Sequence, residues 1–375
     1  MTLRVSWAQA LAWRMRRHFL EPAVDVTPAE VVRRLCGVQA QVASSAELAI
    51  RLRQGRSSPG EVAAALASGE LIKTWAMRGT LHYLTPEEAG IYLSLLAAGR
   101  SWEVPSWQKY FGMRPGDYDE MRLVARDALD GRALTREELA AEMVKRPRLR
   151  HIGTEMASGW GTLLKPLAWQ GDLCFGPSRG NRVTFVRPDQ ASSRWAGIPD
   201  ADAAAPRAIM AYLGAYGPAT VDGFGRFISR GRVAKRSLRA WFAALGSRVV
   251  EVDVDGEATL LLAEHAEELA ATRPSQELRL LGGFDGWVLG PGTEDTHIIP
   301  SPHRRAVSRQ SGWIAPVVVL GGVVAGTWEL AGDVVRIGWF SGRRRPARAT
   351  LAAGVARLRA ILGRELDMEV ASIPA

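Results

Sequence analysis

Apolar and polar residues in the middle of the chain follow first a helical and then an alternating period. Apolar positions over Gly116–Leu129 recur every three to four residues, which is typical of an amphipathic helix. Thr135 and Glu138 have the spacing of a capping box, which predicts the start of a second helix. A third helix is expected over Thr154–Trp169. The two short apolar runs that follow predict a β-hairpin: Leu173–Phe175 and Val183–Val186.

The same order of three helices and a hairpin occurs twice more. The clearer copy has expected helices at Ala205–Ala215, Thr220–Ser229 and Ala234–Leu245, with strands at Val249–Val254 and Ala258–Leu262 around Asp255-Gly256. The fainter copy has helices at Ala8–Leu20, Pro28–Cys36 and Pro59–Ala67, with strands at Ile72–Trp75 and Thr80–Leu84. Three helices followed by a hairpin form the winged-helix variant of the helix-turn-helix. The pattern therefore predicts three winged-helix units in tandem.

Beyond residue 270 the pattern changes to short strands. They are expected at Leu278–Leu281, Trp287–Leu289, Thr296–Ile299, Ile314–Leu320, Val323–Leu330 and Val334–Phe340. A last helix over Pro346–Leu362 has an apolar stripe at Leu351, Val355, Leu358 and Leu362. We expect a small open barrel or curved sheet closed by a helix. The predicted fold is thus α+β, with three winged-helix units over 1–100, 101–195 and 196–270, and a β-barrel-like element with a terminal helix over 271–375.

Length and composition agree with this division. A chain of 375 residues exceeds what one hydrophobic core usually organises, and 47% hydrophobic with 23% charged residues is a globular composition. The longest apolar run, Trp313–Gly326, is shorter than the about 20 residues of a membrane span, and the start of the chain lacks the regions of a signal peptide. We therefore expect a cytoplasmic protein without membrane attachment. Because only Cys36 and Cys174 occur, neither a disulfide framework nor a zinc site is expected, and no cofactor is predicted.

The charge of the chain indicates an anionic partner. Its formal net charge is +9, and 43 of its 48 basic residues are arginines. Guanidinium groups suit bidentate contacts to phosphate, which favours nucleic acid as the partner. An arginine-rich coding bias would produce the same composition, so charge alone leaves both interpretations open.

The segment Gly37-Val38-Gln39-Ala40-Gln41 is the main candidate for chemistry, because no catalytic triad, phosphate loop or dinucleotide motif is present. Gly37 is expected at the C′ position that ends the preceding helix. Residues two apart on an extended chain point the same way, so Gln39 and Gln41 would present two carboxamides in front of Val38 and Ala40. By spacing alone, such a pair is more often a solvated or helix-capping pair than a catalytic one.

Several short motifs, taken together, resemble the AlkZ-type DNA glycosylases, a winged-helix family best known from bacterial self-resistance to DNA-alkylating natural products. They are the Gln-x-Gln element, Met77-Arg78-Gly79-Thr80-Leu81-His82, Gly217-Pro-Ala-Thr220, Gly283-Phe-Asp285 and Gly312-Trp-Ile-Ala-Pro-Val-Val318 followed by Gly326-Thr-Trp328. The resemblance spans nearly the whole chain. It implies tandem winged helices that form a C-shaped channel for double-stranded DNA, and it implies that Gln39 and Gln41 are the catalytic pair.

The activity that the resemblance implies is hydrolysis of the N-glycosidic bond of a bulky N7-alkylguanine, with interstrand crosslinks as a further substrate. A monomeric enzyme is expected. It is also expected to be monofunctional, because the lysine closest in sequence to the glutamines is Lys73, although the N-terminal amine or a lysine brought close by the fold could still form a Schiff base. Seven further residues are predicted to contact DNA or the lesion: Arg78, His82, Arg179, Arg182, His303, Arg304 and Arg305. For the histidines a structural role is the main alternative, and for the charge run 302–305 it is simple solvation.

Two other functions fit the same chain. One is a non-catalytic winged-helix DNA-binding or regulatory protein, in which the glutamines are structural. The other is a protein that sequesters a genotoxic compound. Because regulators usually dimerise on palindromic half-sites, whereas three units in one chain can surround DNA as a monomer, the repeat favours the enzyme.

Overall fold

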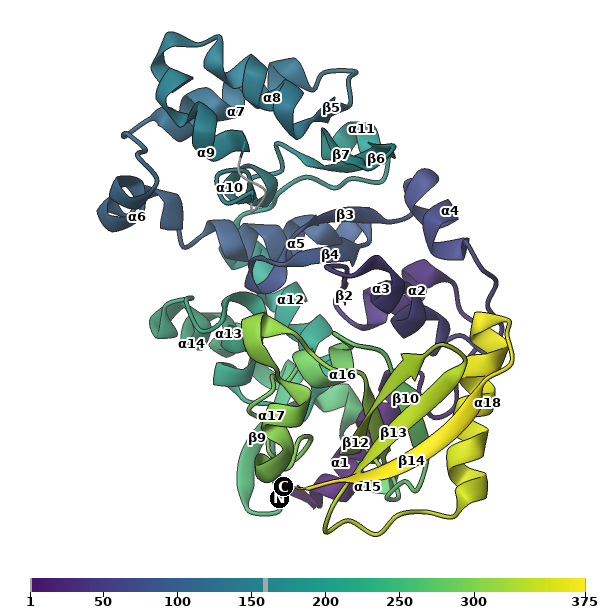
Figure 1. The fold of residues 1–375 in the computed structure, drawn as a ribbon. Coiled ribbons are helices and arrows are strands. Elements are labelled where there is room, and N and C mark those ends of the chain that lie inside the picture. Colours follow the sequence, from purple (N-terminus) through teal and green to yellow (C-terminus); the bar gives the residue numbers. More distant parts are fainter. Residues whose placement is uncertain (1, 158–160, 375) are drawn as a thin grey trace. The chain divides into compact units, whose positions relative to one another are not determined.

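The computed structural model describes residues 2–157 and 161–374, which form two compact parts (Figure 1). Lobe 1 comprises Met1–Val62, Ile209–Phe227 and Phe242–Ala375, and lobe 2 comprises Ala63–Ala208 and Ile228–Trp241. Each lobe is therefore assembled from segments that are far apart in the sequence. Across the described ranges, no helix combines the length and the apolar character needed to cross a membrane.

Lobe 1 begins with a strand and three helices around a short extended segment. These elements are β1 (Leu3–Val5), α1 (Trp7–Arg17), α2 (Pro28–Arg34), β2 (Val38–Gln39) and α3 (Ala43–Arg51). Capping boxes start two of the helices, Ser6 with Gln9 for α1 and Thr27 with Glu30 for α2. The sequence pattern predicted α1 and α2 but missed α3, because Val42 holds its N-cap position without a side-chain hydrogen bond.

The third predicted set of helices and strands is present to within a few residues. It consists of α12 (Ala201–Tyr216), α13 (Val221–Ser229), α14 (Lys235–Ala243), β8 (Val249–Val254) and β9 (Glu257–Leu262), followed by α15 (Ala266–Ala271). Asp255 and Gly256 form the turn of the hairpin with positive φ angles of 49° and 89°. The N-terminal strand β1 extends this hairpin into a three-stranded sheet, since Leu3 pairs with Val252 in parallel. That pairing was not predicted.

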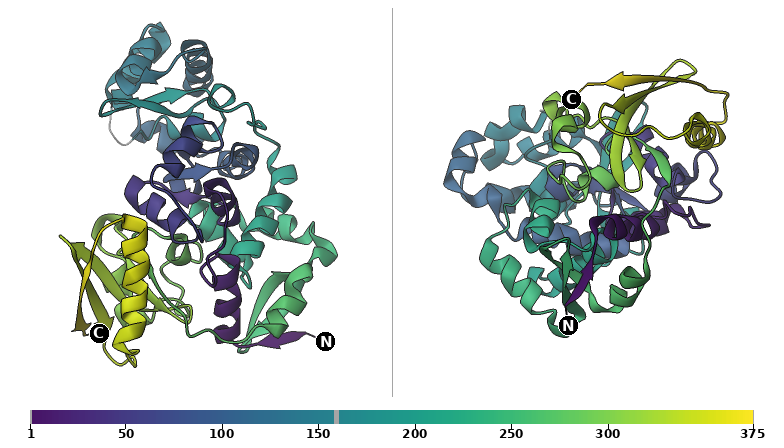
Figure 2. Two further views of the ribbon diagram at one scale, coloured as in Figure 1. Left: turned by 90° about the vertical axis from the view of Figure 1, so that its right-hand side faces the viewer. Right: turned by 90° about the horizontal axis from the view of Figure 1, so that it is seen from below.

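The C-terminal part of lobe 1 is a five-stranded sheet in the order β10-β11-β12-β13-β14. Its strands are β10 (Leu278–Leu281), β11 (Val317–Leu320), β12 (Val323–Ala331), β13 (Val334–Phe340) and β14 (Asp367–Ile373), and all neighbours are antiparallel except β13 and β14. Helix α18 (Arg348–Leu362) runs beside the sheet (Figure 2). It approaches β10 closely at Gly354, where a Cβ atom would lie 2.6 Å from Leu280. The sheet and this helix share one hydrophobic core.

Several expectations for this region are wrong. Trp287–Leu289 belongs to a short helix, α16 (Gly286–Leu289), rather than a strand, because Asp285 caps its start. Thr296–Ile299 forms turns, and the edge strand β14, in which Met368, Val370 and Ile373 pack against the core, was missed. Ile361 instead of Leu362 completes the buried stripe of α18. The sheet is open, with β10 and β14 at its edges, so the described strands do not close into a barrel.

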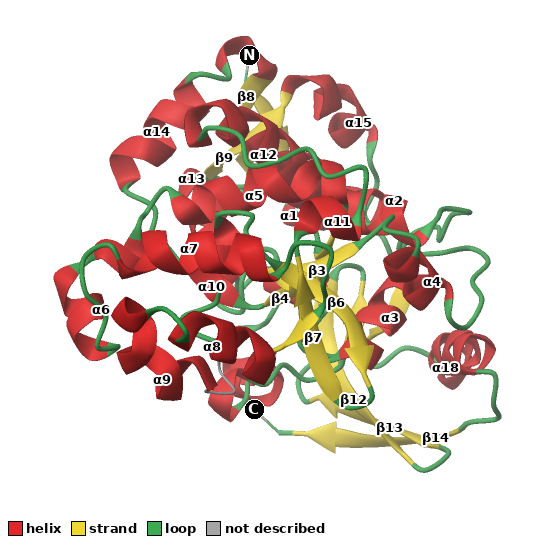
Figure 3. Ribbon diagram, turned by 90° about the horizontal axis from the view of Figure 1, so that it is seen from above, coloured by secondary structure: helices red, strands yellow, loops and turns green. Residues whose placement is uncertain are grey.

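Lobe 2 is built around a sheet with the order β4-β3-β6-β7-β5, with helices α7, α8 and α10 on one side (Figure 3). Its strands are β3 (Ile72–Trp75), β4 (Leu81–Leu84), β5 (Leu134–Thr135), β6 (Cys174–Arg179) and β7 (Arg182–Val186). Its helices are α4 (Glu61–Ala67), α5 (Pro86–Ala97), α6 (Pro105–Tyr110), α7 (Asp117–Ala128), α8 (Arg136–Val144), α9 (Gly153–Ala157), α10 (Lys165–Trp169) and α11 (Pro188–Ala191). The predicted capping box of Thr135 and Glu138 starts α8.

Two predictions for lobe 2 need correction. The expected helix over Thr154–Trp169 is divided into α9 and α10, and residues 158–160 between them lie outside the described ranges. Pro166 stands in the first turn of α10, where its missing N–H costs no hydrogen bond. The first strand of the hairpin, expected to end at Phe175, continues as β6 to Arg179, with an irregularity in its pairing between Gly176 and Arg179, and the chain turns at Gly180.

A buried ion pair joins the end of α3 to the loop before α16 within lobe 1. Arg53 donates from Nη1 to Asp285 Oδ2 at 2.9 Å and from Nη2 to Oδ1 at 2.7 Å, and both side chains are 0% exposed. Nη1 also donates to the carbonyl of Ala49 at 2.7 Å. The bidentate geometry offsets the cost of taking two charges out of water. The pair therefore sets the position of α3 against the C-terminal sheet region.

We expect Arg53→Met to destabilise the protein by about 3–5 kcal/mol, because Asp285 would keep a buried charge without its partner. The exposed pair of Arg56 and Asp25, also 2.7 Å apart, offers a matched control, since Arg56→Met removes a solvent-screened contact. Urea unfolding followed by tryptophan fluorescence measures both. Equal stability of the two variants would contradict the role of the buried pair.

His82 is a buried histidine of lobe 2 with a strongly lowered pKa. Its side chain is 2% exposed, and its Nδ1 lies 3.0 Å from the carbonyl oxygen of Thr80. Burial, reinforced by the nearby charge of Arg78, lowers the pKa of His82 to about 3. The ring is therefore neutral in the folded protein over the physiological range.

This pKa predicts a loss of stability in mild acid. Below about pH 6.5 the unfolded chain binds a proton at His82 that the folded chain does not bind, so the free energy of unfolding falls by up to about 1.4 kcal/mol per pH unit until about pH 3. The variant His82→Leu lacks this group and should show a shallower dependence between pH 6 and 4. Urea unfolding at a series of pH values checks this, and an unchanged slope would refute it.

Candidate active site

The helix α2 ends in a tight turn that starts the glutamine segment. The amide of Gly37 donates to the carbonyl of Val32 at 2.8 Å, and the amide of Cys36 donates to that of Arg33 at 3.1 Å. This is the Schellman arrangement, in which Cys36, with φ of 56°, holds the C′ position and Gly37 follows it with φ of 104°. The expectation that Gly37 holds C′ is therefore wrong by one residue. The chain nevertheless leaves the helix at this point and extends.

The side chains of the extended segment alternate between the interior and the surface. Val38 and Ala40 are buried, with exposures of 4% and 0%, whereas Gln39 is half-buried and Gln41 is exposed. This is the alternation expected of an extended chain with one covered face. The structure thus turns the two glutamines away from the apolar pair, and α3 begins two residues after Gln41.

The turn before the glutamines is held from within lobe 1 by Tyr216. The hydroxyl of this buried residue donates to the carbonyl of Leu35 at 3.0 Å. Gly290 makes room for the ring, since a Cβ atom there would lie 1.9 Å from it. His18 packs edge-on against Tyr216 and Trp287, and its Nε2 lies 3.1 Å from the carbonyl oxygen of Ala215. Burial and the charges of nearby arginines lower the pKa of His18 well below its usual value, so this ring is a neutral packing group.

The segment after the glutamines is held by the Gly283-Phe-Asp285 motif. Gly282 lies against Leu48 of α3, where a Cβ atom would come within 3.2 Å of the leucine side chain. Asp285 binds Arg53, and Phe284 packs edge-on against Trp313, with 5.1 Å between the ring centroids. The Gly283-Phe-Asp285 motif therefore lies beside α3, the helix that follows the glutamines, and it also contacts the motif that contains Trp313.

Two arginines lie at the ends of the helices that precede the glutamine segment, Arg17 at the end of α1 and Arg34 at the end of α2. Arg17 donates from Nε to the carbonyl of Gly214 at 2.9 Å, and Arg34 donates from Nη1 to the carbonyl of Arg17 at 3.3 Å. Arg34 also lies over the ring of Phe19 at 4.7 Å. Burial lowers the pKa of Arg17 and Arg34 from the ordinary arginine value, but a guanidinium stays protonated in proteins. Both side chains therefore keep their positive charge at physiological pH.

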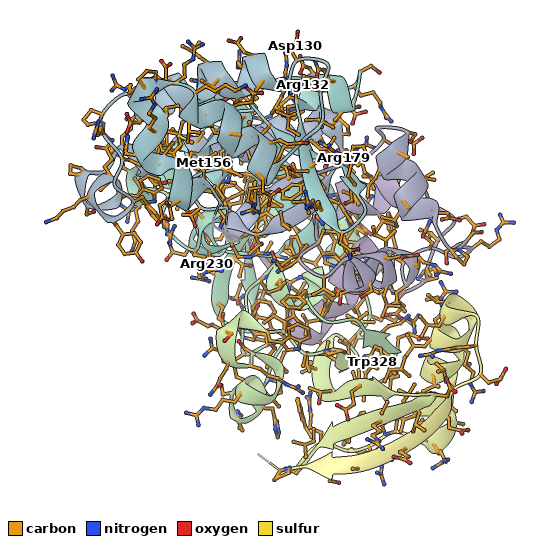
Figure 4. The ribbon with its side chains drawn as sticks, turned by 45° about the horizontal axis from the view of Figure 1, so that its top comes forward. Asp130, Arg132, Met156, Arg179, Arg230 and Trp328 are labelled. Atoms are coloured by element: carbon orange, nitrogen blue, oxygen red, sulfur yellow. The ribbon has the colours of Figure 1, made fainter. Side chains whose placement is uncertain are left out.

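The lobe 2 side chains that were predicted to contact DNA differ in their exposure and in the bonds that they already make. Arg179, labelled in Figure 4, forms an ion pair with Glu138 and donates to the carbonyl of Ala133 at 2.6 Å, so its guanidinium is already engaged. Arg182 is exposed at the start of β7, and Arg78 is half-buried with a positive φ of 59°. His82 is buried, which excludes a direct contact with DNA in this conformation. A contact of His82 with DNA would therefore require a change of conformation, and a contact of Arg179 would require its pair with Glu138 to open.

The candidates between Pro302 and Arg305 divide in a similar way. His303 is 6% exposed and stacks on Phe340 with 4.0 Å between the ring centroids, so a contact with DNA would require this ring to move. Arg304 donates from Nε to the carbonyl of Thr293 at 3.0 Å. Arg305 is exposed. Both histidines predicted for binding are thus interior residues in this structure.

Sequence analysis missed Arg53, Tyr216 and a polar cavity in lobe 1. A buried arginine gives no signal in a single sequence, because arginines are usually exposed. The cavity, of about 370 Å³, contains Arg14, which is 2% exposed and donates from Nη2 to the carbonyl of Pro218 at 3.3 Å. Asp295 and His297 line it as well, bonded to each other at 3.1 Å. Its mixed charges suit polar packing rather than a dedicated anion site.

Metal-binding clusters and reactive thiols are the other side-chain groups that could supply chemistry. In the part of the chain that the structure describes, no group of three or more His, Cys, Asp or Glu side chains could hold a metal ion. Both cysteines are buried, and burial raises the pKa of Cys174 to about 12. The two carboxamides therefore stay the candidate catalytic groups.

Comparisons with known proteins give the family. A family model described as DNA glycosylase AlkZ-like matches residues 32–361. An interstrand DNA cross-link repair glycosylase of Streptomyces sahachiroi is 48% identical over 366 residues, which are 95% of this chain and 99% of that protein. The solved structure of the Streptomyces sahachiroi DNA glycosylase AlkZ is 46% identical, with a TM-score of 0.96 over 98% of this chain and 100% of that one. Because the family model and both relatives extend over nearly the whole fold described above, this chain belongs to the AlkZ-like family of DNA glycosylases.

Proposed function

We propose that this DNA glycosylase is monofunctional and hydrolyses the N-glycosidic bond of bulky N7-alkylguanines in double-stranded DNA, including guanines joined in an interstrand crosslink. The observation that carries the proposal is the pair of outward-turned carboxamides, Gln39 and Gln41. The name of the Streptomyces sahachiroi relative, a cross-link repair glycosylase, supports crosslinks as substrates. The biological role would be repair of alkylation damage or self-resistance to an alkylating natural product.

The alkylated base itself explains why neutral catalytic groups suffice. Alkylation at N7 gives guanine a positive charge, which makes the base a good leaving group without protonation by a general acid. The C–N bond then breaks toward an oxocarbenium-like state, and the remaining task is to place a water near the anomeric carbon. An unmodified nucleoside lacks this positive charge, so such a site would not hydrolyse it.

The two glutamines are suited to that task. A carboxamide oxygen is a weak base but a good acceptor, so it can orient a water and stabilise nearby positive charge. Two acceptors from alternate positions of one extended strand fix the water by geometry rather than by proton abstraction. The clamps on either side, Tyr216 on Leu35 and Asp285 on Arg53, keep that geometry rigid.

We infer that DNA is bound by three winged-helix units, as monomer, in a channel of the kind that the family resemblance implies. The repeated order of helices and hairpins supports the units 1–100, 101–195 and 196–270, with the β-element at 271–375. The net charge of +9 and the exposed Arg182 and Arg305 suit contacts to phosphates. Two buried cysteines that form no disulfide fit an enzyme of the cytoplasm.

The distribution of lysines supports hydrolysis rather than lyase chemistry. A lyase forms a Schiff base between an amine and the sugar. The chain has five lysines, Lys73, Lys109, Lys145, Lys165 and Lys235, and the one closest in sequence to the glutamines is Lys73. Water is therefore the nucleophile that we assign to the site.

Replacement of Gln39 or Gln41 by Ala should slow base release by about 10- to 1,000-fold, because either change removes an acceptor that positions the water. The two losses should be non-additive, since one water serves both groups, and DNA affinity should hardly change. The assay uses a duplex with one N7-alkylguanine, treated with alkali after incubation to cut at abasic sites. Gln310→Ala, at an exposed position of lobe 1, is the matched control. Folded Gln39 and Gln41 variants with the parental rate would overturn the proposed site.

The reaction should release the free alkylated base and leave the strand intact until alkali is added. Borohydride reduces Schiff bases, so its presence during turnover should trap no covalent complex of protein and DNA. A bifunctional glycosylase on its own substrate serves as the positive control. A trapped complex that forms at the rate of base release would show that the enzyme is a lyase.

A further inference from the structure

Lobe 2 contains a large cavity. Its volume is about 780 Å³, which is within the range of sites for small organic molecules. The walls are α4, the strands β3, β4, β6 and β7, and the turn before β5, which carries Arg132 (Figure 4). All of its lining residues belong to lobe 2, whereas Gln39 and Gln41 belong to lobe 1.

Most of the lining is apolar, and its only charged groups are cationic. Aliphatic and aromatic side chains form the walls, among them Leu66, Ile72, Tyr83, Phe175 and Val186. Lys73 and Arg132 are the charged lining residues, and no aspartate or glutamate lines the cavity. Apolar walls around a few polar groups are the usual composition of a ligand pocket. The sign of the charge selects anions.

Lys73 is placed to meet a ligand rather than to support the fold. It stands opposite Tyr83 on β4 and Phe175 on β6, and all three side chains line the cavity. Its ammonium lies over the Phe175 ring, 5.6 Å from the centroid. Among the described residues no carboxylate comes within 4.0 Å of it, and partial burial lowers the pKa of Lys73. Arg132, in contrast, is 3.6 Å from Glu142.

We propose that this cavity binds a small organic anion with an apolar or aromatic body. The acidic group of the ligand pairs with the Lys73 ammonium, and the body packs between α4 and the sheet. Such a ligand supplies the counter-charge that the protein does not provide and covers apolar surface that is otherwise exposed to water. Neither Gln39 nor Gln41 lines this cavity, and the test of the proposal does not depend on base excision.

The test uses the fluorescent probe 1-anilinonaphthalene-8-sulfonate, together with N-phenyl-1-naphthylamine, which has the same aromatic body without the sulfonate. We expect saturable binding of one sulfonate probe per chain and about 10-fold or more weaker binding of the neutral probe. Lys73→Met should remove this preference by weakening only the sulfonate probe. Equal affinities of the two probes for the parent protein, or no saturable binding, would overturn the proposal.

A pair of variants on α4 locates the probe. Ala67 lines the cavity and is exposed, so Ala67→Trp should fill the space and abolish binding, whereas Ala64→Trp, exposed on the same helix but outside the cavity, should not. Circular dichroism checks that each variant folds. If Ala67→Trp does not fold, the Lys73→Met variant and the comparison of the two probes still test the proposal. Displacement of the sulfonate probe by undamaged duplex DNA would assign the cavity to DNA binding and overturn the small-molecule site. Retention of the probe at saturating DNA supports it.

Discussion

The buried pair of Arg53 and Asp285 is the constraint on which the arrangement of lobe 1 depends. Its two parallel hydrogen bonds, 2.9 and 2.7 Å long, are made without any exposure to solvent, so the charges have no alternative partners in water. An apolar contact would hold helix and loop together but would tolerate sliding, whereas a bidentate pair accepts one register. Asp285 simultaneously caps α16, which carries Trp287 into the core beside His18. One carboxylate thereby connects α3, α16 and, through the packing of His18, helix α1.

The glutamine segment lies between this pair and a second anchor at its other end. The Tyr216 hydroxyl holds the carbonyl of Leu35, one residue before the turn of Cys36 and Gly37. The segment is thus short, extended and fixed at both ends, with Val38 and Ala40 packed beneath it. Such a strand can hold two acceptors at a constant separation. A catalyst that acts by positioning a water requires this rigidity more than it requires a strong base.

Regular elements were predictable where local chemistry decides them, and the site was predictable only in part. Capping boxes at Thr27 and Thr135, and the Asp255-Gly256 turn, specify their elements within a few residues of sequence. Helix α3 lacks such a signal at Val42, and α16 exists because Asp285 caps an apolar run that alone resembles a strand. The spacing of Gln39 and Gln41 was enough to predict that both side chains point away from Val38 and Ala40. The ion pair, the parallel pairing of β1 with β8 and the burial of His82 and His303 depend on contacts between distant residues, which periodicity does not encode.

The scarcity of lysine and the burial of both cysteines also affect the resistance of the protein to chemical damage. Compounds that alkylate guanine at N7 attack other soft or neutral nucleophiles, above all thiolates and unprotonated amines. Cys174 holds its proton up to a pH of about 12, Cys36 is covered, and 43 of the 48 basic side chains are guanidinium groups that stay protonated. The positive charge needed for binding phosphates is therefore carried by groups that electrophiles leave intact. A chain of this composition can work in the presence of the reagent whose products it is proposed to remove.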